Sequence, residues 1–273
     1  MTTDIITPMQ LADLRRQVEE VALQAGRFLK ESRLNFDDIS IQSKHSHDYV
    51  TDIDRQSEQL IVSRLKALLP EAGFITEEKT VEQEVGQHDV FWVIDPLDGT
   101  TNYIHDLAPY CVSIALRTEA EILLGVVYEP SRDELFSAAL HQGATLNGQR
   151  IQVTDTADID QCLVMIGYPY NADEYRPFAL KMTERLYGHC ASLRSMGSAE
   201  AELCYLAAGR IDVYFESFIQ PWDVAAGACI VKEAGGTVTD DAGADKLWQS
   251  GRQVLATNGK VHGQMVDIIS KSE

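Results

Sequence analysis

The segment from Val90 to Tyr103 constrains the fold of this chain more than any other. An apolar run from Val90 to Ile94 ends in Asp95-Pro96-Leu97-Asp98-Gly99-Thr100-Thr101. The apolar run predicts a buried strand. The two carboxylates then follow its carboxyl end, which is where α/β sheets build ligand sites.

The residue types after this strand suit a metal and a phosphate. Two acids three residues apart can serve a hard cation such as Mg2+, which takes oxygen ligands and shares them with phosphate groups. Gly99 lets the backbone approach a ligand closely. Thr100 and Thr101 supply hydroxyl and N–H groups where a helix or turn begins, a place that favours anions. Pro96 and Gly99 are equally typical of a plain turn, so this segment alone leaves both interpretations open.

Length and composition set outer limits. The 273 residues allow one large domain or two small ones, and 45% hydrophobic residues are enough for a sizeable core. No apolar stretch approaches the roughly 20 residues of a membrane helix, and the first residues do not resemble a signal peptide. Five scattered cysteines suggest neither a disulfide framework nor a zinc cluster. We therefore expect a cytoplasmic protein with no membrane partner.

The charge is strongly acidic. The chain has 23 Lys and Arg against 42 Asp and Glu, a formal net charge of −19. Such a surface repels nucleic acid, anionic membranes and phosphorylated substrates. A phosphate site in this chain therefore needs bound cations or clustered N–H donors that reverse the local potential.

Two helices are predicted before the central motif. Thr7-Pro8-Met9-Gln10 has the pattern of a capping box, and apolar residues from Leu11 to Leu29 follow a helical period. A second helix is predicted from Thr51-Asp52-Ile53-Asp54 to Pro70. Residues 32–50 are predicted to be irregular, with one possible strand at 39–41. His45 and His47 in this stretch are interpreted as loop residues rather than metal ligands.

The remaining elements indicate two different halves. Strands at about 74–78, 90–95, 111–117, 122–128 and 134–140 predict a largely antiparallel sheet, with an Asn147-Gly148 turn. The second half alternates, with strands near 162–167, 189–194, 211–216 and 252–256 and helices at 174–187, 198–208 and from Pro221 to Gly235. We predict an N-terminal α+β part (1–150) with the metal site and a C-terminal α/β part (151–273) that completes the active site.

Carboxylates recur at the ends of apolar elements. Glu77-Glu78 follows one predicted strand, Asp95 and Asp98 follow another, and Asp223 comes after Pro221-Trp222. Together with Asp54 they supply enough oxygen ligands for more than one hard cation.

With these residues in this order, the chain resembles the inositol monophosphatase family of Mg2+-dependent, lithium-sensitive phosphatases. The resemblance covers nearly the whole chain. The segments that carry it are Trp92 to Tyr103, Trp222-Asp223-Val224-Ala225-Ala226-Gly227 with Glu233-Ala234-Gly235-Gly236, Ile75-Thr76-Glu77-Glu78, Val50-Thr51-Asp52-Ile53-Asp54, Gly197-Ser198-Ala199 and Tyr214-Phe215-Glu216.

The resemblance implies a fold and a set of roles. The fold would be a layered α-β-α-β-α sandwich of the sugar-phosphatase type, of mixed α+β and α/β class, in a homodimer. The metal ligands would be Glu77, Asp95, Asp98, Asp223 and the carbonyl of Leu97. Asp54, Glu77 and Thr100 would position the attacking water. The N–H groups of Gly99 and Thr100 would hold phosphate, Gly197, Ser198, Ala199 and Glu216 would hold the alcohol, and Glu77, Leu97, Asp98 and Asp223 would also contact substrate.

Three charged residues depart from what is frequent in the family. Glu200 and Glu202 follow Gly197-Ser198-Ala199, where small or apolar residues are common. We interpret them as solvated acids on an outer helix face; the alternative is that they add negative charge near the alcohol pocket. Lys79 follows Glu78 at a position where a small residue is frequent.

The function implied is hydrolysis of myo-inositol monophosphates, small phosphorylated polyols, with Mg2+ and more than one ion per site. Glu216 favours this over the related nucleotide phosphatases, because an acceptor-only carboxylate suits a polyol hydroxyl. One alternative is a sister activity on 3′-phosphoadenosine 5′-phosphate, fructose 1,6-bisphosphate or NADP(H). Another is a regulatory protein-binding role in which phosphatase activity is incidental.

Overall fold

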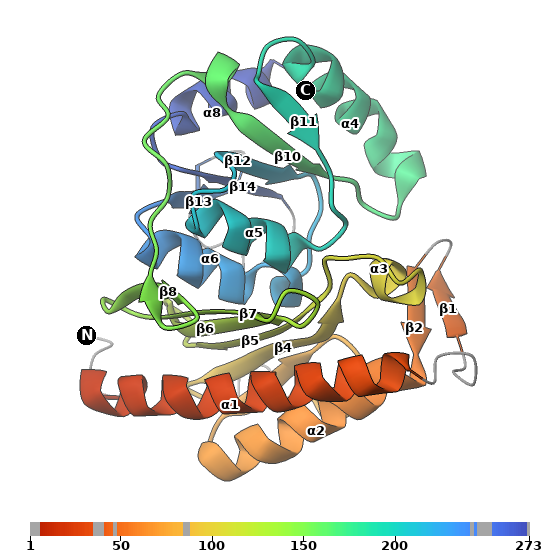
Figure 1. Ribbon diagram of the computed structural model, residues 1–273, viewed down its shortest axis with the longest axis vertical. Helices are drawn as coiled ribbons and strands as arrows, with labels where there is room; N and C mark the ends of the chain where they lie inside the picture. Colours follow the sequence, from red (N-terminus) through yellow and green to blue (C-terminus); the bar gives the residue numbers. More distant parts are fainter. Residues whose placement is uncertain are drawn as a thin grey trace.

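The computed structural model describes residues 6–34, 41–45, 48–83, 88–240, 243–244 and 253–271. Five layers stack as α-β-α-β-α, which confirms the predicted architecture (Figure 1). Helices α1 (Pro8–Arg33) and α2 (Asp52–Leu68) form one outer layer. A seven-stranded sheet, then α5 (Ala199–Ala207) and α6 (Ala225–Glu233), then a five-stranded sheet follow. Helices α4 (Ala172–Leu186) and α8 (His262–Ser270) cover the far side.

The first helix begins as its sequence predicts. Thr7 Oγ1 accepts from the Gln10 N–H at 3.3 Å, and Gln10 Oε1 accepts from the Thr7 N–H at 2.9 Å. This reciprocal capping box satisfies two N–H groups that the helix start leaves open. The apolar stripe of α1 is buried at Leu11, Val18 and Leu29 in the core shared with α2 and the large sheet.

The seven-stranded sheet keeps its strands in chain order. They are β3 (Gly73–Thr76), β4 (Phe91–Asp98), β5 (Cys111–Arg117), β6 (Ile122–Glu129), β7 (Glu134–Ala139), β8 (Gly143–Leu146) and β9 (Gln149–Arg150). The later neighbours pair antiparallel, in line with the largely antiparallel sheet predicted, while β3 and β4 pair in parallel, which was not predicted. Asn147 and Gly148 join β8 to β9 with φ angles of 48° and 76°. A two-residue hairpin turn of type I′ requires positive φ at both positions.

The five-stranded sheet has the order β11 (Ser192–Arg194), β10 (Leu163–Gly167), β12 (Val213–Glu216), β14 (Val254–Thr257) and β13 (Thr237–Thr239). Its pairs are partly parallel and partly antiparallel. The sequence did not predict β13, which is too short for a clear period, or α8. The five-residue α3 (Thr100–Ile104) begins where a helix or a turn was expected.

Two further predictions were imprecise. The stretch at 32–50 contains a hairpin of β1 (Ile41–His45) and β2 (Asp48–Thr51), where one strand at 39–41 was expected. Ser46, His47 and the side chain of His45 lie outside the described residues. The helix predicted from Pro221 is divided, because a 3-10 turn at Pro221–Asp223 precedes α6 and Val224 between them has φ −138°.

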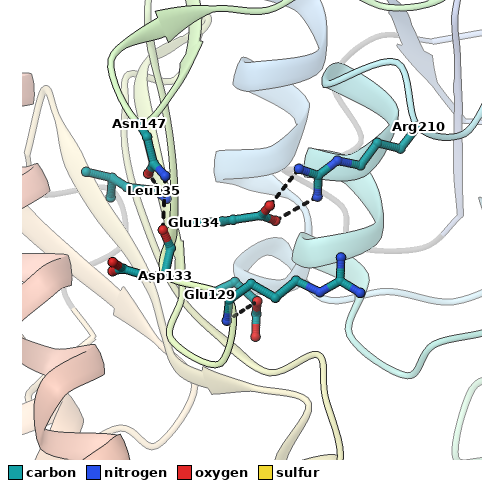
Figure 2. Close-up of polar contacts among 7 residues, drawn as sticks. Glu129, Asp133, Glu134, Leu135, Asn147 and Arg210 are labelled. Carbon is teal, nitrogen blue, oxygen red and sulfur yellow. Dashed lines mark hydrogen bonds and ion pairs between the residues drawn. The ribbon is translucent and has the colours of Figure 1, made fainter.

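The two halves of the chain share one interior. The apolar core between the sheets takes Phe136 from the first half and Tyr205 from the second. At its edge, Arg210 donates to both carboxylate oxygens of Glu134 at 2.6 and 2.7 Å (Figure 2). The Arg210 guanidinium also lies 5.0 Å from the centre of the Tyr205 ring. The division at residue 150 stays a prediction.

Candidate active site

The predicted site residues meet in one cleft of about 980 Å³ between the two halves of the chain. Asp54 is the one that does not line it; its side chain is 1% exposed and lies directly behind Thr100. The lining residues that the sequence predicted are Glu77, Asp95, Leu97, Asp98, Gly99, Thr100, Gly197, Ser198, Ala199, Glu216 and Asp223.

A β-bulge puts Asp95 and Asp98 on the same side of the sheet. Two residues three apart on a regular strand point to opposite faces. Here Asp95 pairs with Ser113 and Asp98 with Cys111. Between these two pairs the chain advances by three residues on β4 and by only two on β5. The extra residue restores the common face, and Pro96, which lacks an N–H, sits within the irregular stretch. Both carboxylates therefore face the cleft.

The carboxylates of the cleft oppose one another's ionisation. Burial raises the pKa of Asp95 and of Asp223, and the negative charge of Glu77 raises both further. Burial also raises the pKa of Asp98. A bound cation would relieve this repulsion, since it favours the charged form of each carboxylate.

Asp98 is held from the opposite wall of the cleft. Its Oδ2 accepts from Ser198 Oγ at 2.7 Å and from the Glu200 N–H at 2.8 Å. These donors come from the start of α5, about a hundred residues later in the chain. Ser198, predicted to hold the alcohol of the substrate, thus directs its hydroxyl to Asp98 in this structure.

Residues on one face of α2 form hydrogen bonds with the segments that carry the cleft residues. Thr100 Oγ1 lies 3.1 Å from Asp54 Oδ1, and Ser57 Oγ donates to the Pro96 carbonyl at 3.1 Å. Glu58, fully buried, accepts from the Glu78 N–H at 2.8 Å and from both Thr76 and Thr80. This fixes the loop that carries Glu77. Our sequence interpretation missed Ser57 and Glu58; their signal was polar residues three and four positions after Asp54, on the buried side of an amphipathic helix.

Thr100 connects the turn after β4 to these contacts of α2. Its hydroxyl is also 3.0 Å from the Leu97 carbonyl. Gly99 before it has φ 87°, and a Cβ there would lie 3.1 Å from the Pro109 carbonyl oxygen. Only glycine fits this turn without strain or crowding.

Glu216, on β12, lines the same cleft. Tyr214 donates a hydrogen bond to its carboxylate. Burial raises the pKa of Glu216 to about 7. A Cβ on Gly167, its partner on β10, would lie 2.2 Å from Glu216 Oε2, so the glycine leaves room for the carboxylate.

The interpretation of Glu200 and Glu202 as solvated acids was wrong. Their side chains are 0% and 1% exposed, because α5 lies between the two sheets and has no outer face (Figure 1). Burial raises the pKa of each to about 8. Glu202 accepts from the Met196 N–H and lines the cleft. Glu200 turns away from the cleft towards α6.

The donor chemistry of the cleft fits Mg2+. Among the described residues, no three His, Cys, Asp or Glu side chains are grouped so that they could hold an ion by themselves. Mg2+ does not require such a group, since it commonly keeps several waters and takes one or two carboxylates together with substrate phosphate. Carboxylates spread along a cleft, with the Leu97 carbonyl between them, match that requirement.

Comparison with known proteins agrees with this geometry. The model of the inositol monophosphatase family matches residues 10–273. The chain belongs to this family. The Nus factor SuhB of Escherichia coli K12 is 40% identical over 240 residues, which are 88% of this chain and 89% of that protein.

Solved structures show the same family fold. The extragenic suppressor protein SuhB of Bartonella henselae superposes with a TM-score of 0.89 at 32% identity, covering 95% of this chain and 99% of that one. The inositol monophosphatase of Anabaena (Nostoc) gives 0.85 at 32% identity, covering 96% of each chain. In the part of the chain that the structure describes, no helix has the length and apolar character to cross a membrane.

Proposed function

We propose that this protein is a Mg2+-dependent phosphatase that hydrolyses myo-inositol monophosphates to inositol and phosphate. The observation that carries the proposal is that Asp95, Asp98, Asp223, Thr100 and Glu216 line one cleft. An acidic protein with a formal charge of −19 needs cations to bind a phosphate there.

The residues of the cleft would have two roles, metal binding and orientation of the attacking water. Glu77, Asp95, the Leu97 carbonyl, Asp98 and Asp223 would hold Mg2+, which supplies positive charge for the phosphate and lowers the pKa of water. Thr100, backed by Asp54, orients the attacking water through its hydroxyl, because Asp54 and the Leu97 carbonyl can accept the proton of that hydroxyl and leave its lone pairs to accept from water.

The part of the cleft around Glu216 would bind the alcohol. Glu216 would accept from hydroxyls of the polyol, and the backbone at Gly197 and Ala199 would line its other side. The N–H groups of Gly99 and Thr100 would hold phosphate oxygens. More than one ion per site, sensitivity to lithium, a homodimer and a cytoplasmic location stay predictions.

The test is phosphate release with Mg2+ from inositol 1-phosphate beside 3′-phosphoadenosine 5′-phosphate, fructose 1,6-bisphosphate and NADP. Fastest turnover of inositol 1-phosphate supports the proposal. Faster turnover of another substrate would support phosphatase activity but contradict the assignment of an inositol-binding pocket. Full activity at high lithium would remove the protein from the lithium-sensitive group.

A second candidate is a regulatory protein-binding role. The observation in its favour is that relatives about 40% identical are named as Nus factors rather than as enzymes. Retention of the biological role by a variant without phosphatase activity would support this candidate. Loss of the role together with the activity would favour the enzyme.

A further inference from the structure

One buried carboxylate contacts two elements, β5 and α6, next to the proposed metal ligands. Glu200 Oε1 accepts from Ser113 Oγ at 2.9 Å and from the Ala226 N–H at 3.2 Å. Glu200 Oε2 accepts from the Gly227 N–H at 2.6 Å. Its side chain is fully buried. The contacts therefore do not arise from a surface acid that happens to lie near a helix.

Each contact leads to a residue that faces the cleft. Ser113 is the strand partner of Asp95. Ala226 and Gly227 form the first turn of α6, which follows Asp223 after a single intervening residue. The backbone N–H of Glu200 itself donates to Asp98 Oδ2 at 2.8 Å. One residue thus connects the positions of three acids, of which Asp95 and Asp98 come from β4 and Asp223 from the turn before α6.

The packing around α6 shows that this connection is tight. A Cβ on Gly227 would lie 2.6 Å from Glu200 Oε2 and 2.6 Å from Leu203 Cβ. On the other side, a Cβ on Gly125 of β6 would lie 2.5 Å from the Ala226 carbonyl oxygen. Two glycines therefore let α6 sit between α5 and the large sheet, and Glu200 fixes how far its first turn approaches α5.

We infer that Glu200 is a positioning residue that sets the spacing between the Asp98 and Asp223 carboxylates and thereby the affinity of the site for Mg2+. The inference rests on the proposed function only in taking these acids as ligands. Like charges that must approach one cation repel each other, so the backbone has to hold them in place. A carboxylate that accepts from the Ser113 hydroxyl of β5 and from two N–H groups of α6 does this directly.

The test measures metal binding without substrate. Mg2+ is titrated calorimetrically into Glu200→Ala, Glu200→Gln and the wild-type protein, and Mn2+ binding is followed by electron paramagnetic resonance. Glu200→Ala is expected to weaken Mg2+ binding by about 10- to 100-fold, the usual cost of losing a residue that supports metal ligands. Glu200→Gln has the same size and one oxygen acceptor for Gly227, so it is expected to recover most of the affinity.

A destabilised control separates positioning from loss of stability. Val231→Ala removes a fully buried side chain from the same helix, one to two turns away from these contacts. It is expected to lower the melting temperature and leave the Mg2+ dissociation constant unchanged. Wild-type affinity in folded Glu200→Ala, or equal losses in Val231→Ala, would overturn the inference.

The same titration distinguishes a failure of this inference from a failure of the proposed function. Mg2+ binding by a wild-type protein that hydrolyses no phosphate ester would contradict the proposed function and leave the role of Glu200 to be decided by the variants. A wild-type protein that binds neither Mg2+ nor Mn2+ would overturn both.

Discussion

The hydroxyl of Thr100 lies 3.1 Å from a carboxylate oxygen of Asp54, a residue 46 positions earlier and in the outer helical layer. The contact crosses from α2 to the turn that ends β4. It places this hydroxyl in the cleft that Asp95, Asp98 and Asp223 also line. A water beside this hydroxyl can be oriented without Thr100 itself being consumed.

Removing that hydroxyl should affect chemistry more than binding. Thr100→Val keeps the shape of the side chain and is expected to lower kcat by about 100- to 10,000-fold, the range for a group that handles a proton in the transition state. Thr100→Ser restores a hydroxyl and should regain most of the rate. Steady-state phosphate release measures both variants, and equal kcat values for Thr100→Val and the wild-type protein would exclude Thr100 from catalysis.

Asp98→Asn removes a charge from the proposed metal site while preserving size and most hydrogen bonds. Turnover is expected to fall by at least about 100-fold, since even residues that only support metal ligands cost up to that much. Circular dichroism should stay that of the wild type. Asp13→Asn on α1, outside the cleft and with a side chain that is 56% exposed, serves as the control and should leave turnover unchanged. Near-normal turnover of Asp98→Asn would reject the assignment.

Lys79 is the single basic side chain that lines the described part of the cleft. Its φ is 53°, a conformation that glycine adopts without strain. We expect Lys79→Gly to raise KM by up to about fivefold, because an exposed charge contributes at most about 1 kcal/mol. The melting temperature should not fall. A lower melting temperature with unchanged KM would show that Lys79 serves the loop rather than the substrate.

The Glu134–Arg210 ion pair should stabilise the contact between the two halves of the chain. Arg210→Ala is expected to lower the free energy of unfolding by about 1–2 kcal/mol, because the pair is bidentate but partly exposed. Arg132→Ala removes an exposed guanidinium that lies 5.7 Å from the centre of the Tyr205 ring, and it should cost no more than about 1 kcal/mol. Urea unfolding measures both, and equal losses would contradict a special role for the pair.

His262 should make stability depend on pH. Its ring nitrogens lie 3.0 Å from the hydroxyls of Thr239 and Thr257, and burial lowers its pKa below 6.5. The unfolded chain therefore takes up a proton at a higher pH than the folded one, so stability is lost as pH falls below about 6.5. Thermal unfolding between pH 7.5 and 5.5 should show a smaller loss for His262→Gln than for the wild-type protein; identical pH profiles would contradict this.

The pH experiment needs the comparison with His262→Gln. Buried carboxylates such as Glu202 and Glu216, whose pKa values are raised to about 8 and about 7, act in the opposite direction. Each becomes easier to bury once protonated, so it favours folding as pH falls. The difference between the two proteins isolates the histidine.

Local features could be predicted because short-range interactions decide them. The capping box of Thr7 and Gln10, the period of α1 and the Asn147-Gly148 turn depend on residues within a few positions of each other. The strand β13 was missed for the converse reason, since its three residues contain too little periodic pattern. Helix α8 was missed although it has nine residues, as many as α5 and α6, which were predicted. The resemblance to a family placed the acids of the cleft in one site, which spacing alone could not do.

The sequence by itself determined that carboxylates follow apolar strands, that Gly99 and Thr100 come next, and that the acidic chain needs a cation to bind phosphate. Only the tertiary structure decided which way these groups face. A bulge between Asp95 and Asp98 brings both to the cleft, and the position of α5 between two sheets buries Glu200. The physical reason is that strand register and layer packing depend on contacts between residues far apart in the chain, which a local pattern does not contain.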